Sequence, residues 1–253
     1  MLTTSSIDFA YPWWLSYGHL VVLVPALAGL VVGRMRHWGR WAMASLGLLA
    51  LWSGAAYFVM GSVGLNRPPK LLTDNFLSSG KGKVLDIGAG TGRSSIMVLT
   101  ARPQATLVAS DLFADSFEHH FGHGDRPQDR LMQNLKAAGV DQRATIETAD
   151  MLKLPYETAS FDGIVSAYAM DHVGREGAKK ALAEANRVIK PGGDFLLILI
   201  ENDRWTKFAF GPLLSHGGTR GAKWWRERAV EAGFQVAEEG TAPATLYFLL
   251  RRS

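Results

Sequence analysis

The chain has 253 residues, of which 47% are hydrophobic, and this length accommodates one domain of ordinary size with an appendage. It contains no cysteine, which excludes disulfides, thiolate metal sites and a cysteine nucleophile. Its formal net charge is +4, but residues 1–65 contain few acidic or strongly basic side chains, namely Asp8, Arg34, Arg36 and Arg40. The uneven distribution of charge predicts two regions that face different solvents.

Two uncharged segments near the N-terminus, residues 13–33 and 41–61, predict a hairpin of two transmembrane helices. At about 1.5 Å per residue, each is long enough to span a hydrocarbon core about 30 Å thick. The link between them contains three arginines and reads as a turn outside the hydrocarbon. Aromatic residues flank the segments, as in the aromatic belts at membrane interfaces. One group lies at the start of the first segment and consists of Tyr11, Trp13, Trp14 and Tyr17; the other lies at the link and consists of Trp38 and Trp41.

Three other interpretations of this region remain open. A cleaved signal peptide is disfavoured because the leader has no Lys or Arg and a second apolar segment follows. Core helices of a soluble domain are disfavoured because uncharged segments this long are rare there. A hairpin that enters the interface without crossing stays compatible with the polar residues His19, Ser16 and Ser45.

Residues 84–93, VLDIGAGTGR, end a short apolar strand in three glycines and lead into a helix. This turn lets a ligand approach the main chain and places it at a helix N-terminus. The dinucleotide fingerprint requires a glycine where Arg93 stands, so pyrophosphate is disfavoured. Asp86 would repel a phosphate but suits a positively charged ligand with an amino group. The turn therefore indicates S-adenosylmethionine.

Strands and helices alternate after this turn. We expect strands at 105–110, 144–148, 161–166 and 195–200, with helices at 127–138 and 175–190 between them. Asp111 ends the first of these strands, where a carboxylate can accept the hydroxyls of a ribose. Asp150 and Met151 follow the next strand, where they suit an adenine.

Four ordered segments of residues 81–201 resemble the class I S-adenosylmethionine-dependent methyltransferases, especially the ubiquinone and menaquinone methyltransferase-like branch. They are VLDIGAGTG, the acid Asp111, TADMLKLPYETASFDGIVSAYAMDHV and LAEANRVIKPGGDFLLI. The resemblance covers about half the chain. It implies a Rossmann-like α/β fold with a seven-stranded sheet, helices on both faces, and a final antiparallel hairpin at about 235–239 and 245–250. We place a membrane anchor at 1–65 and the methyltransferase domain at 66–253.

The resemblance also implies roles for individual residues toward S-adenosylmethionine. Asp86 and the turn face its methionine part, Asp111 its ribose, and Asp150 its adenine, although Asp86 and Asp150 are also suited to capping a helix. The complete cofactor set is Asp86, Gly88, Ala89, Gly90, Gly92, Asp111, Leu112, Asp150, Met151 and Ser166. The product would be S-adenosylhomocysteine.

Methyl transfer is an in-line displacement that needs alignment of the acceptor, and a base only where the acceptor must lose a proton. The loop after the strand at 161–166 lies where this architecture binds ligands. Tyr168, Asp171 and His172 are therefore the catalytic candidates. The alternative is that Asp171 caps the next helix and His172 packs behind it.

Two further stretches are candidates for covering the site. His119, His120 and His123 lie between Asp111 and the next helix, where a substrate lid or cofactor cover is favoured over a metal site because the spacing is unspecific. Residues 201–218 are aromatic and apolar beside Arg204 and Lys207, which suits a pocket cap or contact with a membrane surface.

An anchor beside the site favours a lipophilic small molecule or lipid as acceptor, whereas scattered basic residues disfavour nucleic acid. The alternatives are an adaptor that binds the cofactor without turnover, and an aminopropyltransferase, which Asp86 disfavours. Positive charges on either side of the anchor nearly balance and do not decide its orientation. Because the cofactor is made in the cytoplasm, we expect a two-pass anchor with the catalytic domain on the cytoplasmic side.

Overall fold

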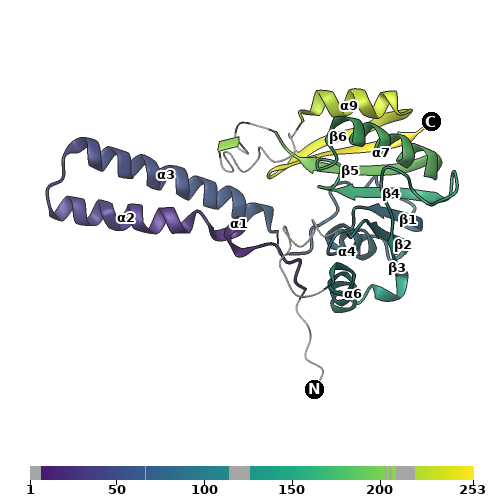
Figure 1. Cartoon of the computed structure of the whole chain (residues 1–253), viewed down its shortest axis with the longest axis horizontal. Coiled ribbons are helices and arrows are strands. Elements are labelled where there is room, and N and C mark those ends of the chain that lie inside the picture. The colour runs from purple at the N-terminus through teal and green to yellow at the C-terminus, as the bar shows by residue number, and fades with distance from the viewer. Residues whose placement is uncertain (1–6, 66, 114–125, 203, 205–206, 209–219) are drawn as a thin grey trace, which may run out of the picture.

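The computed structural model describes residues 7–65, 67–113, 126–202, 204, 207–208 and 220–253. Two parts are evident: a long helical hairpin projects from one end of an α/β domain (Figure 1).

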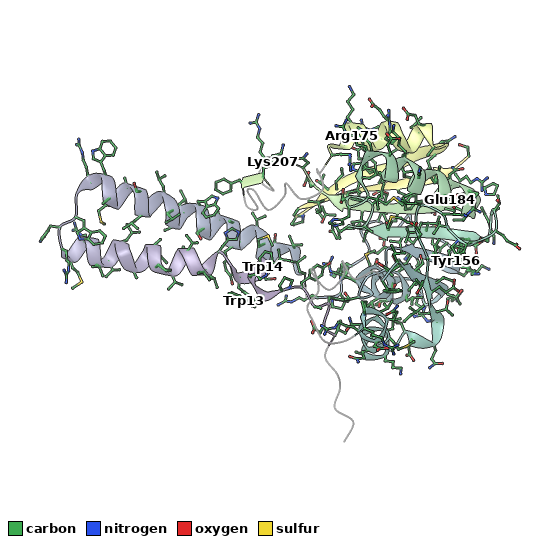
Figure 2. All side chains as sticks on the ribbon, in the orientation of Figure 1. Trp13, Trp14, Tyr156, Arg175, Glu184 and Lys207 are labelled. Atoms are coloured by element: carbon green, nitrogen blue, oxygen red, sulfur yellow. The ribbon has the colours of Figure 1, made fainter. Side chains whose placement is uncertain are left out.

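The hairpin consists of α1 (Trp13–Tyr17), α2 (Leu20–Met35) and α3 (Arg40–Val63). Two stretches in it are long and apolar enough to cross a membrane, Trp13–Met35 with a mean hydropathy of 2.0 and Arg40–Val63 with 1.6. In their most apolar windows only 6% and 22% of the residues are buried. Side chains project outward along the whole hairpin (Figure 2). Its large apolar residues include exposed ones such as Leu51 and Phe58. The two helices are therefore not the packed core of the α/β domain.

The α/β domain is built on a seven-stranded sheet of order β3-β2-β1-β4-β5-β7-β6. Its strands are β1 (Lys81–Ile87), β2 (Gln104–Asp111), β3 (Ala144–Thr148), β4 (Phe161–Ala167), β5 (Ile189–Ile200), β6 (Phe234–Ala242) and β7 (Thr245–Arg252). The first five strands pair in parallel, and β7 runs antiparallel to both β5 and β6. This arrangement confirms the Rossmann-like fold expected from the sequence.

Helices cover both faces of the sheet, as expected. One face packs against α4 (Arg93–Ala101) and α6 (Pro127–Ala137), and the other against α7 (Gly174–Val188) and α9 (Ala222–Glu231). Along β1, Val84 contributes to the first core and Leu85 to the second, because successive strand residues point to opposite faces. A 3-10 turn, η2 (Asp141–Arg143), precedes β3.

The structure differs from the predicted elements at one helix end. The helix α7 stops at Val188 rather than Lys190, and Ile189 is already extended with φ −79° and ψ 144°. Pro191 keeps the helix from reaching Lys190, because a proline disfavours the helical conformation of the residue before it. The strand β5 therefore begins six residues earlier than expected, and its pairing with β4 shifts register between Phe161 and Gly163.

The segment before the hairpin packs on the α/β domain. Phe9 is fully buried in the core beneath α4 and α6. Its carbonyl accepts a 3.0 Å hydrogen bond from the Thr91 hydroxyl, and the Asp8 carbonyl accepts one of 2.8 Å from Asn134. Residues 7–11 thus contact the domain that follows the hairpin, while the boundary at residue 65 remains a prediction.

Candidate active site

A cavity of about 1030 Å³ lies where the carboxyl ends of β1, β2 and β4 meet the foot of the hairpin. The wall on the sheet side is formed by the turn after β1, the end of β2, Met151 and residues 167–169. The opposite wall is formed by residues 61–64 at the end of α3, the link 67–72 and Tyr11. One cavity therefore joins the glycine turn to the end of an apolar helix.

The glycine turn has a backbone that side chains would not allow. Gly88 has φ +76°, and a Cβ there would lie 2.3 Å from the Cβ of Ala169. Gly92 has φ +93°, and a Cβ there would lie 2.5 Å from Leu131 Cδ1. Gly88, Ala89 and Gly90 line the cavity, whereas Gly92 supports the turn from behind. The result is an open main-chain cradle that fits the methionine part of S-adenosylmethionine.

The Asp86 side chain is fully buried behind the cradle and is absent from the described cavity lining. Its carboxylate accepts hydrogen bonds of 2.8 Å from Ser94 and 2.6 Å from Ser95, in the first turn of α4. Burial raises its pKa to about 7, although these hydrogen bonds oppose the shift. Direct contact with the cofactor stays a prediction. The observed bonds instead match the alternative role of holding the start of the helix.

Asp111 lies in the cavity wall at the end of β2. Its carboxylate bridges two backbone amides, accepting from Gly90 at 2.9 Å and from Phe113 at 3.0 Å. Each carboxylate oxygen keeps capacity for a further hydrogen bond, such as one from a ribose hydroxyl. Leu112 and Met151 also line the cavity, and their contact with an adenine remains a prediction.

Besides Asp86 and Gly92, two further predicted cofactor residues are absent from the lining of the cavity in the described part of the chain. Asp150 is exposed, and its carboxylate accepts a 2.8 Å hydrogen bond from the Leu152 amide. Ser166 is buried, and its hydroxyl donates to the Ile87 carbonyl at 2.8 Å. Their roles toward the cofactor remain predictions.

The three catalytic candidates separate in the structure. Tyr168 and His172 line the cavity, and the Tyr168 hydroxyl shares a 2.6 Å hydrogen bond with Thr245. Asp171 is buried and accepts a 3.1 Å hydrogen bond from the Ile200 amide. Burial raises its pKa to about 6. Asp171 therefore ties the loop to β5, and no side chain caps α7 at its N-cap residue, Val173.

Sequence reasoning missed several residues of the wall. The sequence predicts Tyr11 at a membrane interface, and in the structure it lines the cavity. Burial raises the pKa of Tyr11 above its ordinary value; Arg93 opposes this shift and Tyr168 adds to it. Arg67, Lys70 and Arg93 also line the cavity. The NRPPK link was a signal for two of them, because it joins the hairpin to the α/β domain, but the sequence suggested for it only a domain boundary and positive charge flanking the anchor.

The predicted covers fall mostly outside the described residues. His119, His120 and His123 all lie there, as do most of residues 201–218. Of the second stretch, Phe208 contacts the hairpin, since its carbonyl accepts a 2.9 Å hydrogen bond from the Trp52 indole. Lys207 lies beside α3 (Figure 2).

The sequence of this chain is similar to those of known methyltransferases. Residues 84–193 match the family model described as "Methyltransferase domain". The chain is 31% identical over 121 residues to the 27-O-demethylrifamycin SV methyltransferase of Amycolatopsis mediterranei, covering 46% of this chain and 39% of that protein. It is also 31% identical over 116 residues to the demethylmenaquinone methyltransferase of Deinococcus radiodurans, covering 46% of this chain and 42% of that protein.

Solved structures agree on the fold. An O-methyltransferase family 2 protein from Planctomyces limnophilus superposes with a TM-score of 0.61 at 15% identity, over 82% of this chain and 70% of that one. A protein from Methanosarcina mazei superposes with a TM-score of 0.56 at 16% identity, over 73% of this chain and 99% of that one. The chain spans only 39 to 57% of the length of the first curated relatives that it matches. The family model covers residues 84–193, from within β1 to within β5.

Proposed function

Because the chain carries the methyltransferase domain of the class I S-adenosylmethionine-dependent family, we propose that it is a membrane-anchored enzyme that methylates a lipophilic small molecule or lipid. The observation that carries this proposal is the shared cavity. Its wall includes both the glycine turn and Gly61, Ser62 and Val63, the last residues of the apolar helix α3. An acceptor dissolved in the membrane would thus meet the cofactor at the foot of the hairpin.

S-adenosylmethionine supplies an electrophilic methyl group on a sulfonium when it is bound. The residues of this chain would position the cofactor around that group: the backbone of Gly88 and Gly90 would lie against the methionine part, and Asp111 would accept hydrogen bonds from the ribose hydroxyls. Leu112 and Met151 would pack against the adenine. These roles explain why the turn must be free of side chains on the cavity side.

At the acceptor end, alignment accounts for most of the catalysis. Tyr168 orients the acceptor through its hydroxyl. The hydrogen bond that this hydroxyl shares with Thr245 fixes its position. His172 receives the proton where the acceptor atom carries one, because an imidazole titrates near neutral pH. Asp171 contributes indirectly, as a positioning residue that holds this loop on β5.

The hairpin supports a location in the membrane. Its helices are apolar, largely unburied and long enough to span a bilayer. Trp13, Trp14 and Tyr17 are exposed, as in an interfacial belt. Trp13 and Trp14 lie near the end of the hairpin that meets the domain (Figure 2). Relatives named demethylmenaquinone and ubiquinone/menaquinone methyltransferases support a lipophilic acceptor. We infer a two-pass anchor with both chain ends in the cytoplasm, where the cofactor is made.

The test is to incubate the detergent-purified full chain with methyl-labelled S-adenosylmethionine and a lipid extract of its native membranes. We expect label in an organic-soluble product, and none with Asp111→Ala. Cofactor binding without transfer to any lipid or aqueous extract would instead favour an adaptor. Label only in water-soluble products would contradict the lipophilic acceptor.

A further inference from the structure

The cavity wall carries an excess of positive charge at its hairpin side. Among the described lining residues, the cationic side chains are Arg67, Lys70 and Arg93, and the single carboxylate is Asp111. Asp111 lies at the opposite, cofactor end and already accepts two backbone amides. Asp86 lies behind the wall, where its carboxylate is bonded to two serines. Neither acid neutralises the hairpin side.

The backbone amide of Arg67 and the guanidinium of Arg93 bind the same backbone carbonyl. The Gly64 carbonyl, which follows the last turn of α3, accepts a 3.0 Å hydrogen bond from the Arg67 amide and a 3.4 Å one from the Arg93 guanidinium. Arg93 also donates to the Val63 carbonyl at 3.3 Å. The side chains of Arg67 and Lys70 remain exposed at this edge of the cavity. A cationic cluster therefore stands between the end of α3 and the glycine turn.

The cluster has no charged partner within the described ranges. None of its three members forms an ion pair there. The buried Nε of Arg93 has no hydrogen-bond partner either. The helix carbonyls that Arg93 contacts carry only partial charges. A half-buried guanidinium in this state favours an anion brought by a ligand.

The cofactor increases the need for an anion. S-adenosylmethionine carries a sulfonium and an amino group against one carboxylate, so it adds a net positive charge to the same cavity. Like charges that share one cavity raise each other's free energy, and the more so where they are shielded from water. A neutral or cationic acceptor leaves this repulsion unrelieved, whereas an anionic acceptor offsets it.

We propose that the acceptor is an amphiphile with an anionic oxygen group, which Arg67, Lys70 and Arg93 bind at the foot of α3. Its apolar part lies along the wall formed by Val63, Leu71 and Leu72, toward the membrane. This inference rests on the proposed function and adds the charge of the acceptor to it.

The test separates native membrane lipids by anion exchange into acidic and neutral fractions. Each fraction is offered, with labelled S-adenosylmethionine, to the full chain in phosphatidylcholine nanodiscs, whose own headgroups carry no net charge. The variant is Arg67→Gln with Lys70→Gln. The matched control is Lys136→Gln with Lys180→Gln, which removes two exposed cations that are absent from the described cavity wall. Arg93 is left intact because it also holds the end of α3.

We expect labelled product from the acidic fraction, and a KM for that fraction raised at least tenfold by the cavity variant but not by the control. Affinity for S-adenosylmethionine, measured by calorimetry, should change less than twofold in both. Product confined to the neutral fraction, or a KM that the cavity variant leaves unchanged, would overturn the anionic acceptor while the proposed function stands. A loss of cofactor affinity in the cavity variant would assign the cluster to the cofactor's carboxylate and overturn the proposal. No product from either fraction would refute the lipophilic acceptor itself.

Discussion

Replacement of Asp86 by Asn tests whether a buried, protonatable carboxyl supports the glycine turn. The side chain is inaccessible to solvent and bonded to Ser94 and Ser95, so Asn fits the same space. Both serine hydroxyls can reverse their roles to accept from the new amide. The main consequence is therefore removal of a titrating group.

The sign of the pH effect follows from the raised pKa. Asp86 shifts from an ordinary 3.8 to about 7 in the folded chain. Between these values the folded state retains a proton that the unfolded state has lost, so the free energy of unfolding falls as pH rises. At roughly 1.4 kcal/mol per pKa unit, the full loss is on the order of 4 kcal/mol. About 2 to 3 kcal/mol of it falls between pH 5 and pH 8.

The assay is denaturant unfolding of the full chain in detergent at pH 5 and pH 8, for wild type and Asp86→Asn. The stability of the variant relative to wild type should rise by about 2 to 3 kcal/mol from the lower to the higher pH. Asp162→Asn is the control. Burial raises the pKa of Asp162, but hydrogen bonds from Lys190 and the Lys83 amide outweigh it and hold the pKa below its ordinary value. The control should show no such trend, and equal pH slopes for wild type and Asp86→Asn would refute the reasoning.

Three other predictions follow from the packing and the anchor. Gly88→Ala should lower cofactor affinity, measured by calorimetry, at least tenfold, because the new Cβ would lie 2.3 Å from the Cβ of Ala169. Gly80→Ala is the control, because Gly80 has a similar φ of +75° but no atom within 4 Å of the new Cβ, and equal losses of affinity in both variants would assign the effect to φ alone. Phe9→Ala should cost about 3 to 5 kcal/mol of stability in denaturant unfolding, because the ring is fully buried, and a cost below about 1 kcal/mol would show that this segment is not part of the core. Finally, the α/β domain should resist added protease in intact spheroplasts, and its digestion there would reverse the predicted orientation.

Local patterns predicted the sheet well. The apolar strands, the glycine turn and the helix α7 each depend on residues that are close in sequence. The buried residues of α7 recur at helical spacing: Ala178, Ala181, Leu182, Ala185 and Val188. The amphipathic helix α9 was not predicted, because its strongest apolar residues, Trp224 and Trp225, are adjacent rather than spaced at a helical period.

Long-range contacts decided what the sequence could not. Tyr11 reaches the cavity because Phe9 is anchored to Thr91, a residue far along the chain. The direction of Asp86 depends on two serines of the following helix, and that of Asp171 on an amide of β5. A carboxylate beside a glycine turn looks the same in sequence whether it faces the ligand or supports the loop from behind.

The central claim is that the acceptor reaches the cofactor from the membrane in which the chain is anchored. The direct measurement reconstitutes the chain into vesicles and supplies native lipids either in the same vesicles or in separate ones, with labelled S-adenosylmethionine outside. Rapid labelling is expected only where chain and lipids share a bilayer. Equal labelling of both vesicle populations, or labelling of an aqueous extract alone, would contradict it.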